Sequence, residues 1–308
     1  MKLVFFGTPN FAVPSLEKLN ESKHSILAVI TSPDTKSGRG LKFNSPPIKE
    51  YAIKNNLLLK QPKSLKNESF INFLVDLNAD LFVVVAFKIL PEAILNIAKF
   101  GSINLHASLL PKYRGAAPVH HAILNGDTVL GLTTFFLNKN IDTGNILLQN
   151  KINITNNTTT GEALEELSIV GSSLVLETIT LIKNKSSKIK VQDHSNATFA
   201  PKIKIKDSKI NWLSNANNIH NQIRAFSPIP GAYTYIMKKR VKLFGSEIIL
   251  DKNYKLEPGQ ISFKNKMFLV GTKTSSISIS KIHIEGKNIL ASNQFILGYS
   301  HLDGKRFD

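Results

Sequence analysis

The front half of the chain alternates between continuous apolar runs and stretches with helical periodicity. The apolar runs are rich in β-branched residues and read KLVFF, SILAVIT, LFVVVAF and GSINLH. Helical patterns lie between them at about 11–20, 48–55 and 70–77, and a longer one covers about 160–182. Buried strands that alternate with helices are typical of a mainly parallel sheet covered on both faces. The pattern therefore predicts a doubly wound α/β domain.

The pattern changes after this long helix. Residues 183–212 contain eight lysines, two acidic residues and no sustained period, which is typical of a linker that runs along a surface. Short β runs follow at close spacing: GAYTYIM, VKLFGSEIIL, GQISF, MFLVG and SISISKIHI. Such runs indicate a small barrel or sandwich. We therefore expect an α/β domain over 1–186, a basic linker over 187–206 and a small OB-like β-barrel over 207–308.

Positive charge is concentrated toward the end of the chain. The formal net charge of the 308 residues is +17. Residues 1–200 hold 21 Lys and Arg against 15 acidic residues, giving +6, and residues 201–308 hold 18 against 7, giving +11. A surface this basic attracts polyanions, although biased coding toward Lys, Asn and Ile is an alternative source of the excess. OB-like barrels commonly hold nucleic acid, so the charge is compatible with a nucleic-acid partner.

The composition also excludes several kinds of chemistry. The chain has no cysteine, which excludes disulfides, thiolate catalysis and cysteine-ligated zinc. The apolar run at the amino terminus reaches a glycine within a few residues, too soon for the core of a signal peptide. No apolar run approaches the roughly 20 residues that cross a bilayer. We therefore expect a soluble, cytoplasmic protein without a membrane partner.

Two polar residues stand two apart where an apolar strand runs into a loop, in the stretch INLHASLLPKYRGAAP. Positions two apart on a strand face the same way, so the side chains of Asn104 and His106 can converge. Asp142 follows in an Asp-Thr-Gly turn, and a carboxylate beside an imidazole orients it and favours its charged form. Asn104 could then donate to a developing oxyanion while His106 and Asp142 act as an acid/base pair.

Each of these residues also has a purely structural interpretation. A histidine near a strand end is often a structural hydrogen bonder, and an aspartate in such a turn often only forms the turn. The Gly-Thr-Pro stretch at 7–9 lacks both the GxGxxG spacing and the lysine of a P-loop. The pattern alone therefore leaves an active site and a hydrogen-bonded core open as alternatives.

Five motifs together carry a resemblance that no single motif does. GTPNFAVPSL, SPDTKSGRG, INLHASLLPKYRGAAP, NIDTGNIL and IRAFSPIPGAYT, in this order and at these separations, closely resemble the methionyl-tRNA formyltransferase family. The resemblance covers nearly the whole chain. It implies a Rossmann-like formyltransferase domain over 1–186 and an OB-like tRNA-binding domain over 207–308.

The resemblance also implies a reaction. In this family the formyl group of 10-formyltetrahydrofolate passes to the α-amino group of methionyl initiator tRNA for translation initiation. The matching catalytic positions are Asn104, His106 and Asp142. Asn104 and protonated His106 stabilise the tetrahedral oxyanion, and Asp142 tunes His106 and helps to move protons through water. The resemblance implies no metal, and we expect a monomer.

Binding residues follow from the same resemblance. The folate segments are the turn Ser108, Leu109, Leu110 and Pro111 together with the stretch that contains Phe87, Ile89 and Leu90. The long polar loop at 31–47 resembles a basic finger that orders against the acceptor end of tRNA, while the linker follows the phosphates. Its expected tRNA contacts, with those of the linker, are Lys36, Arg39, Lys42, Lys204 and Lys206. A disordered surface loop is the alternative.

Other formyltransferases share the front domain, so the three catalytic positions alone do not identify the acceptor. Glycinamide ribonucleotide transformylase resembles that domain only. A sugar-nucleotide formyltransferase, such as one that modifies aminoarabinose, can carry a similar carboxy-terminal domain and remains the alternative. The +11 of the back third and the basic finger favour tRNA. A noncatalytic RNA-binding protein on the same scaffold is a third interpretation, and the presence of all three catalytic side chains argues against it.

Overall fold

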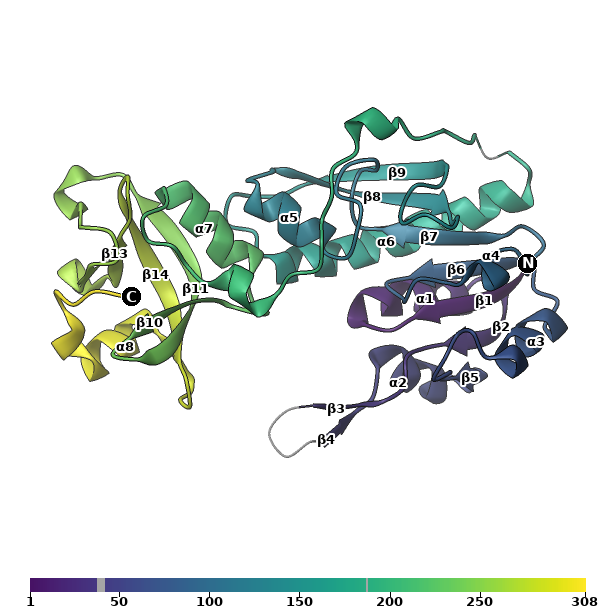
Figure 1. Ribbon diagram of the computed structural model, residues 1–308, viewed down its shortest axis with the longest axis horizontal. Helices are drawn as coiled ribbons and strands as arrows, with labels where there is room; N and C mark the ends of the chain where they lie inside the picture. The colour runs from purple at the N-terminus through teal and green to yellow at the C-terminus, as the bar shows by residue number, and fades with distance from the viewer. Residues whose placement is uncertain (38–41, 187) are drawn as a thin grey trace. The chain divides into compact units, whose positions relative to one another are not determined.

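The computed structural model describes residues 1–37, 42–186 and 188–308 (Figure 1). The described chain forms two compact units, each built from more than one segment of the sequence. Unit 1 contains Met1–Gly115, Leu130–Ile152 and Leu164–Phe199, and unit 2 contains Ala116–Val129, Asn153–Ala163 and Ala200–Asp308. Two short segments from the front of the sequence thus belong to the same unit as the back third of the chain.

A seven-stranded sheet forms the centre of unit 1 (Figure 1). Its order is β5-β2-β1-β6-β7-β8-β9. The strand pairs from β5 through β7 are parallel, and β7 pairs with β8 antiparallel. The strands are β1 (Lys2–Gly7), β2 (Ser25–Ile30), β5 (Leu59–Lys60), β6 (Leu81–Val85), β7 (Ser102–His106), β8 (Val129–Phe136) and β9 (Ile146–Asn153).

The strand order reverses at β1, because the chain first proceeds outward to β2 and β5 and then returns to add β6 on the other side. In open α/β sheets, ligands bind outside the carboxyl ends of the strands at such a switch point. The ends of β1, β6 and β7 are neighbours at this edge. The fold therefore directs attention to the loops that leave these three strands.

Helices cover both faces of this sheet. Residues Leu3 to Phe6 of β1 alternate between the two faces, yet all are fully buried. On one face, Phe70, Leu74 and Ile94 pack in one apolar cluster with residues of β1, β2 and β6. The helices of the front half are α1 (Val13–Asn20), α2 (Pro47–Lys54), α3 (Glu68–Asp76) and α4 (Glu92–Leu95), and α6 (Thr160–Lys183) is the long helix. This arrangement confirms the predicted doubly wound α/β class.

A two-stranded hairpin lies in the long loop after β2. Strands β3 (Thr35–Ser37) and β4 (Lys42–Asn44) pair antiparallel. At the base of the hairpin, the Lys49 ammonium lies 2.6 Å from the Asp34 carboxylate, and the Gln61 amide donates to the same side chain at 2.9 Å. The bonds from Gln61 and Lys49 lower the pKa of Asp34. The base of the loop is therefore tied to α2 and to the residue after β5.

Unit 2 contains an antiparallel sheet, which confirms the expectation of many short strands in the back third. Its order is β10-β11-β14-β13-β12, and β15 pairs with β14. The strands are β10 (Ala232–Ile236), β11 (Lys239–Ile249), β12 (Ile261–Ser262), β13 (Leu269–Gly271), β14 (Ser276–Ile284) and β15 (Ile289–Ala291). Helices of this unit are α5 (Pro118–Leu124), α7 (Ala216–Ala225) and α8 (Ser292–Gly298).

Aromatic rings fill the core of unit 2. Trp212 stacks on Phe307 with ring centroids 5.4 Å apart, and its indole N–H donates to the Thr234 hydroxyl at 3.0 Å. Phe268 and Phe295 stack beside them in the same apolar cluster. Buried indole groups need such a partner because an unpaired N–H is costly. The ring stack ties the carboxy-terminal residues to the sheet.

Within the parts of the chain that the structure describes, no helix has both the length and the apolar character to span a membrane.

Candidate active site

Strand β7 brings the two polar candidates to one face of the sheet. Leu105 faces α6, where a Cβ on Gly171 would lie only 2.7 Å from its Cδ2 atom. Asn104 and His106 alternate with Leu105 and therefore face away from α6. Asn104 is half-buried and His106 is 6% exposed. The strand thus places both side chains on the same face, as the sequence predicted.

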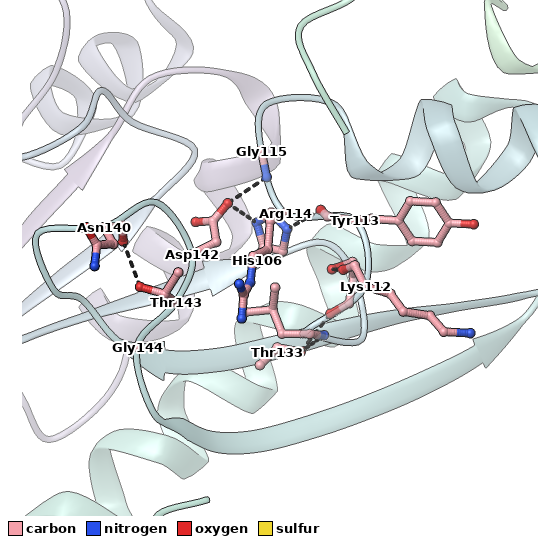
Figure 2. A network of polar contacts seen from close by, with 12 residues as sticks. His106, Lys112, Tyr113, Arg114, Gly115, Thr133, Asn140, Asp142, Thr143 and Gly144 are labelled. Atoms are coloured by element: carbon pink, nitrogen blue, oxygen red, sulfur yellow. Dashed lines mark hydrogen bonds and ion pairs between the residues drawn. The ribbon is translucent and has the colours of Figure 1, made fainter. Parts of the chain in front are cut away.

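His106 is hydrogen-bonded at one ring nitrogen and faces a carboxylate with the other (Figure 2). Its Nε2 atom lies 2.9 Å from the Tyr113 carbonyl oxygen, and because a carbonyl only accepts, Nε2 carries the proton of this bond. Its Nδ1 atom faces the Asp142 carboxylate with 3.8 Å between Nδ1 and Oδ2. The edge of the Phe135 ring packs at a centroid distance of 6.4 Å. The hydrogen bond at Nε2 orients the ring and leaves Nδ1 on the side of Asp142 without a hydrogen bond to that carboxylate.

Asp142 lies in the turn between β8 and β9 and has a left-handed backbone with φ of 52°. Its Oδ2 atom accepts a hydrogen bond of 2.7 Å from the Gly115 N–H. Gly144, two residues on, lies so close to β8 that an added Cβ would meet the Phe136 carbonyl oxygen at 1.7 Å. The turn that carries the carboxylate is therefore closely fitted to the strand beside it.

Two residues that the sequence did not single out complete this network. The Arg114 guanidinium is buried and donates to the Gln192 side-chain oxygen from Nε at 3.2 Å and from Nη2 at 2.6 Å. Nη2 also lies 2.9 Å from Nδ1 of His194. Burial lowers the pKa of Arg114, and the negative charge of Asp142 acts in the opposite direction. Arg114 is thus a buried cation in the field of Asp142.

The amide nitrogen of Gln192 contacts the turn that carries Asp142. Its Nε2 atom donates to the Asp142 carbonyl at 3.0 Å and to the Gly144 carbonyl at 2.7 Å. Gln192 stands 50 residues from Asp142 and 78 from Arg114. No hydrophobic period connects such distant positions. For this part of the network, the sequence offers one signal, which is the arginine of the KYRG stretch that follows β7. It offers none for Gln192.

The turn from Ser108 to Pro111 is firmly bonded to the protein itself. The Ser108 hydroxyl donates to the Lys112 carbonyl at 2.6 Å. The Leu110 N–H donates to the Thr133 hydroxyl, and its carbonyl accepts from the Gln149 amide. The Leu110 side chain is buried with Phe135 in a small apolar cluster. Leu109 lies against Gly131 of β8, where an added Cβ would meet it at 2.3 Å.

The second predicted folate segment leaves the end of β6, beside the switch point. Phe87 packs against Phe6 of β1 with ring centroids 5.6 Å apart. Leu90 is buried in the apolar cluster of this face, whereas Ile89 is 70% exposed. The segment therefore has two anchors and presents one apolar side chain outward at the carboxyl edge of the sheet.

The predicted tRNA contacts fall in two regions. Lys36 and Lys42 belong to the paired backbone of the β3–β4 hairpin, and Arg39 lies outside the described residues. Lys204 and Lys206 are exposed at the short helical turn Ile205–Ser208, in unit 2.

Among residues 1–37, 42–186 and 188–308, no group of three or more His, Asp or Glu side chains is placed to hold a metal ion.

Comparison with known proteins places the chain in one family. Residues 1–179 match the formyl transferase family, and residues 202–300 match the formyl transferase C-terminal domain. The methionyl-tRNA formyltransferase of Acetivibrio thermocellus is 37% identical over 307 residues, which is 99% of each chain. That of Thermodesulfovibrio yellowstonii is 43% identical over 297 residues, covering 96% of this chain and 95% of the relative.

A solved structure agrees with this result. The Helicobacter canadensis N-formyltransferase, in complex with folinic acid and dTDP-3-aminofucose, has a TM-score of 0.65 and 25% identity. The match covers 91% of this chain and 98% of that one. The fold and the two matched domains define a formyltransferase. The chain belongs to the methionyl-tRNA formyltransferase family.

Proposed function

We propose that this protein transfers the formyl group of 10-formyltetrahydrofolate to the α-amino group of methionyl initiator tRNA, giving N-formylmethionyl-tRNA for translation initiation. The single observation that carries the chemistry is the pairing of His106 with Asp142, whose Nδ1 and Oδ2 atoms lie 3.8 Å apart at the carboxyl end of β7. The full-length similarity to methionyl-tRNA formyltransferases supports the acceptor.

The geometry of the site supports the following roles for the catalytic residues. A neutral amine attacks the formyl carbon, and negative charge develops on the formyl oxygen. Because Nε2 of His106 is engaged by the Tyr113 carbonyl, we assign the Nδ1–H as its donor to that oxygen, together with the amide of Asn104. Asp142 faces the positive charge that the ring then carries and, through water, passes the proton that leaves the amine to the folate nitrogen. The bond between this nitrogen and the formyl carbon then breaks, and tetrahydrofolate leaves.

We propose that the folate binds to the loops that follow β6 and β7. Ile89 offers an exposed apolar surface, and backbone groups near Phe87 and Leu90 read the pterin edge. Since the Leu110 N–H and carbonyl already have partners in the protein, the turn at 108–111 acts chiefly as a rigid wall. The H. canadensis relative, which was solved with folinic acid, supports this class of co-substrate.

For the tRNA, we propose contacts by Lys36, Arg39 and Lys42 of the loop at 31–47 and, separately, by Lys204 and Lys206 in the second unit. Lysines and arginines that neutralise phosphates release counterions and supply most of the sequence-independent affinity. The formal +11 of residues 201–308 supports the back third as the tRNA-binding domain. In this proposal the formyltransferase domain covers 1–186 and the linker 187–206, and the enzyme is a cytoplasmic monomer.

The first experiment measures formyl transfer from 10-formyltetrahydrofolate to methionyl initiator tRNA by the native protein and by His106→Asn. We expect kcat of the variant to fall by at least about 100-fold, the usual contribution of a group that moves or holds a proton in the transition state. His301→Asn replaces an exposed histidine in the second unit and is the matched control. Undiminished turnover by His106→Asn would remove its catalytic role.

The competing function is formyl transfer to an amino sugar, as the name of a sugar-nucleotide relative suggests. The same assay therefore includes a nucleotide-linked 4-amino-4-deoxyarabinose as a second acceptor. Transfer to tRNA alone supports the proposed function. Transfer to the sugar alone would retain the fold and chemistry but replace the acceptor.

A further inference from the structure

The stretch Tyr113, Arg114 and Gly115 holds three different parts of the site. The Tyr113 carbonyl accepts from Nε2 of His106, and the Gly115 N–H donates to the Asp142 carboxylate. Between them, the Arg114 guanidinium donates two hydrogen bonds to the side-chain oxygen of Gln192. Figure 2 shows the first two of these contacts, at the imidazole and the carboxylate. Three consecutive residues thus set the positions of these two groups and of one residue of the linker.

Gln192 closes this set of bonds into a ring. Its amide nitrogen donates to the carbonyls of Asp142 and Gly144, so it holds the backbone of the turn whose carboxylate Gly115 holds. The bonds from Arg114 fix which end of the amide faces the turn, since a guanidinium can only donate. Asp142 is therefore constrained from its backbone and from its side chain at once.

The side chains that make up the ring are largely shielded from water. Gln192 is 3% exposed, Arg114 and His106 are each 6% exposed, and the Asp142 side chain is 12% exposed. A buried polar group that loses its partner is not rescued by solvent, so a change at one member moves the others or leaves them unpaired. The linker is in this way part of the construction of the active site.

We propose that Gln192 is a positioning residue that holds the Asp142 carboxylate against His106, so that the linker must be seated for rapid formyl transfer. This inference rests on the proposed catalytic role of His106 and Asp142. Gln192 acts through the turn and touches no reacting atom. A displacement of about 1 Å in such a group is enough to reduce a rate by about 100-fold.

The test uses Gln192→Glu, which preserves length and still accepts from Arg114 but cannot donate to the two carbonyls of the turn. We expect kcat for formyl transfer to fall by about tenfold or more, with KM for folate and for tRNA changed by less than about twofold. The matched control is Gln222→Glu, because Gln222 also donates to two backbone carbonyls, those of Asp207 and Lys209 in unit 2. We expect the control to leave kcat unchanged.

A double-mutant cycle separates positioning from general stability. If Gln192 acts only through Asp142, then Gln192→Glu costs little further in an Asp142→Asn background, whereas a loss of overall stability would add in full. Additive losses, or an unchanged kcat in Gln192→Glu, would overturn the inference while leaving the proposed function intact. Full activity of Asp142→Asn would instead overturn both the inference and the catalytic role of Asp142 on which it rests. If Gln192→Glu does not fold, Gln192→Met, which is neutral and of similar length, carries the same cycle.

Discussion

Single residues decide how closely the catalytic turn fits the sheet. Gly144 is needed because any side chain there would collide with the Phe136 carbonyl, and the left-handed backbone of Asp142 suits a residue type that tolerates this conformation. The sequence predicted Asn104, His106 and Asp142 because strand alternation and turn chemistry are local signals. It could not predict Gln192, since a hydrogen bond between residues 50 positions apart leaves no local pattern.

Gly144→Ala tests the fit of this turn. An added Cβ 1.7 Å from the Phe136 oxygen forces the turn to move, so we expect a loss of about 1–3 kcal/mol in stability and of about 100-fold in kcat. Thermal unfolding and steady-state kinetics measure the two effects. Gly298→Ala is the control, because its added Cβ meets nothing within 4 Å. Wild-type activity in Gly144→Ala would contradict the fit described for this turn.

Among the elements, α7 differs from the prediction for the back third, which rests on β runs alone. Ala216, Ile219 and Ile223 recur at helical spacing and are buried in this helix. The strands β1 and β6 were predicted because both faces are buried, which gives uninterrupted apolar runs. The antiparallel direction of β8 has no such signal, because it depends on the path of the connecting chain rather than on composition.

Helix α7 also carries a buried histidine that makes the stability of unit 2 depend on pH. Nε2 of His220 bonds the Asn156 carbonyl at 2.8 Å, Nδ1 lies 2.9 Å from the Ser246 hydroxyl, and burial lowers the pKa of this ring. In the unfolded chain the ordinary value of 6.5 applies. The unfolded state therefore binds more protons below pH 6.5, so the stability present above this pH is lost as the pH falls.

We expect the midpoint of thermal unfolding to decrease between pH 7.5 and 5.5, and His220→Gln to make this decrease shallower. Glutamine can still donate to the Asn156 carbonyl but has no group that titrates in this range. Unfolding scans in matched buffers at several pH values provide the measurement. The same slope in the variant and the native protein would show that other groups govern the acid limb.

At the scale of the whole molecule, charge rather than shape sets the expected behaviour toward tRNA. The chain carries +17, and the part after residue 200 contributes +11 of it. Affinity that depends on phosphate neutralisation falls steeply as salt concentration rises. Composition alone thus predicts that tRNA binding depends strongly on salt concentration. The basic residues responsible take no part in the chemical step.

The double variant Lys204→Ala, Lys206→Ala tests this expectation. In a plot of log Kd for tRNA against log salt concentration, the slope of the double variant should be smaller by about one to two. Each phosphate contact contributes somewhat less than one to this slope. The KM for folate should stay unchanged. Lys54→Ala, Lys66→Ala removes the same charge from exposed sites of unit 1 and is the control. Equal effects of both pairs would assign the salt dependence to net charge alone.

The single tryptophan of the chain gives the molecule a built-in optical reporter. Trp212 is 5% exposed, stacks on Phe307 and bonds Thr234, all within unit 2. Its fluorescence therefore changes when this unit opens, whereas His106 belongs to unit 1. Comparing the fluorescence transition with the transition in circular dichroism, which averages over all helices and strands, reveals whether the two units melt together or one after the other.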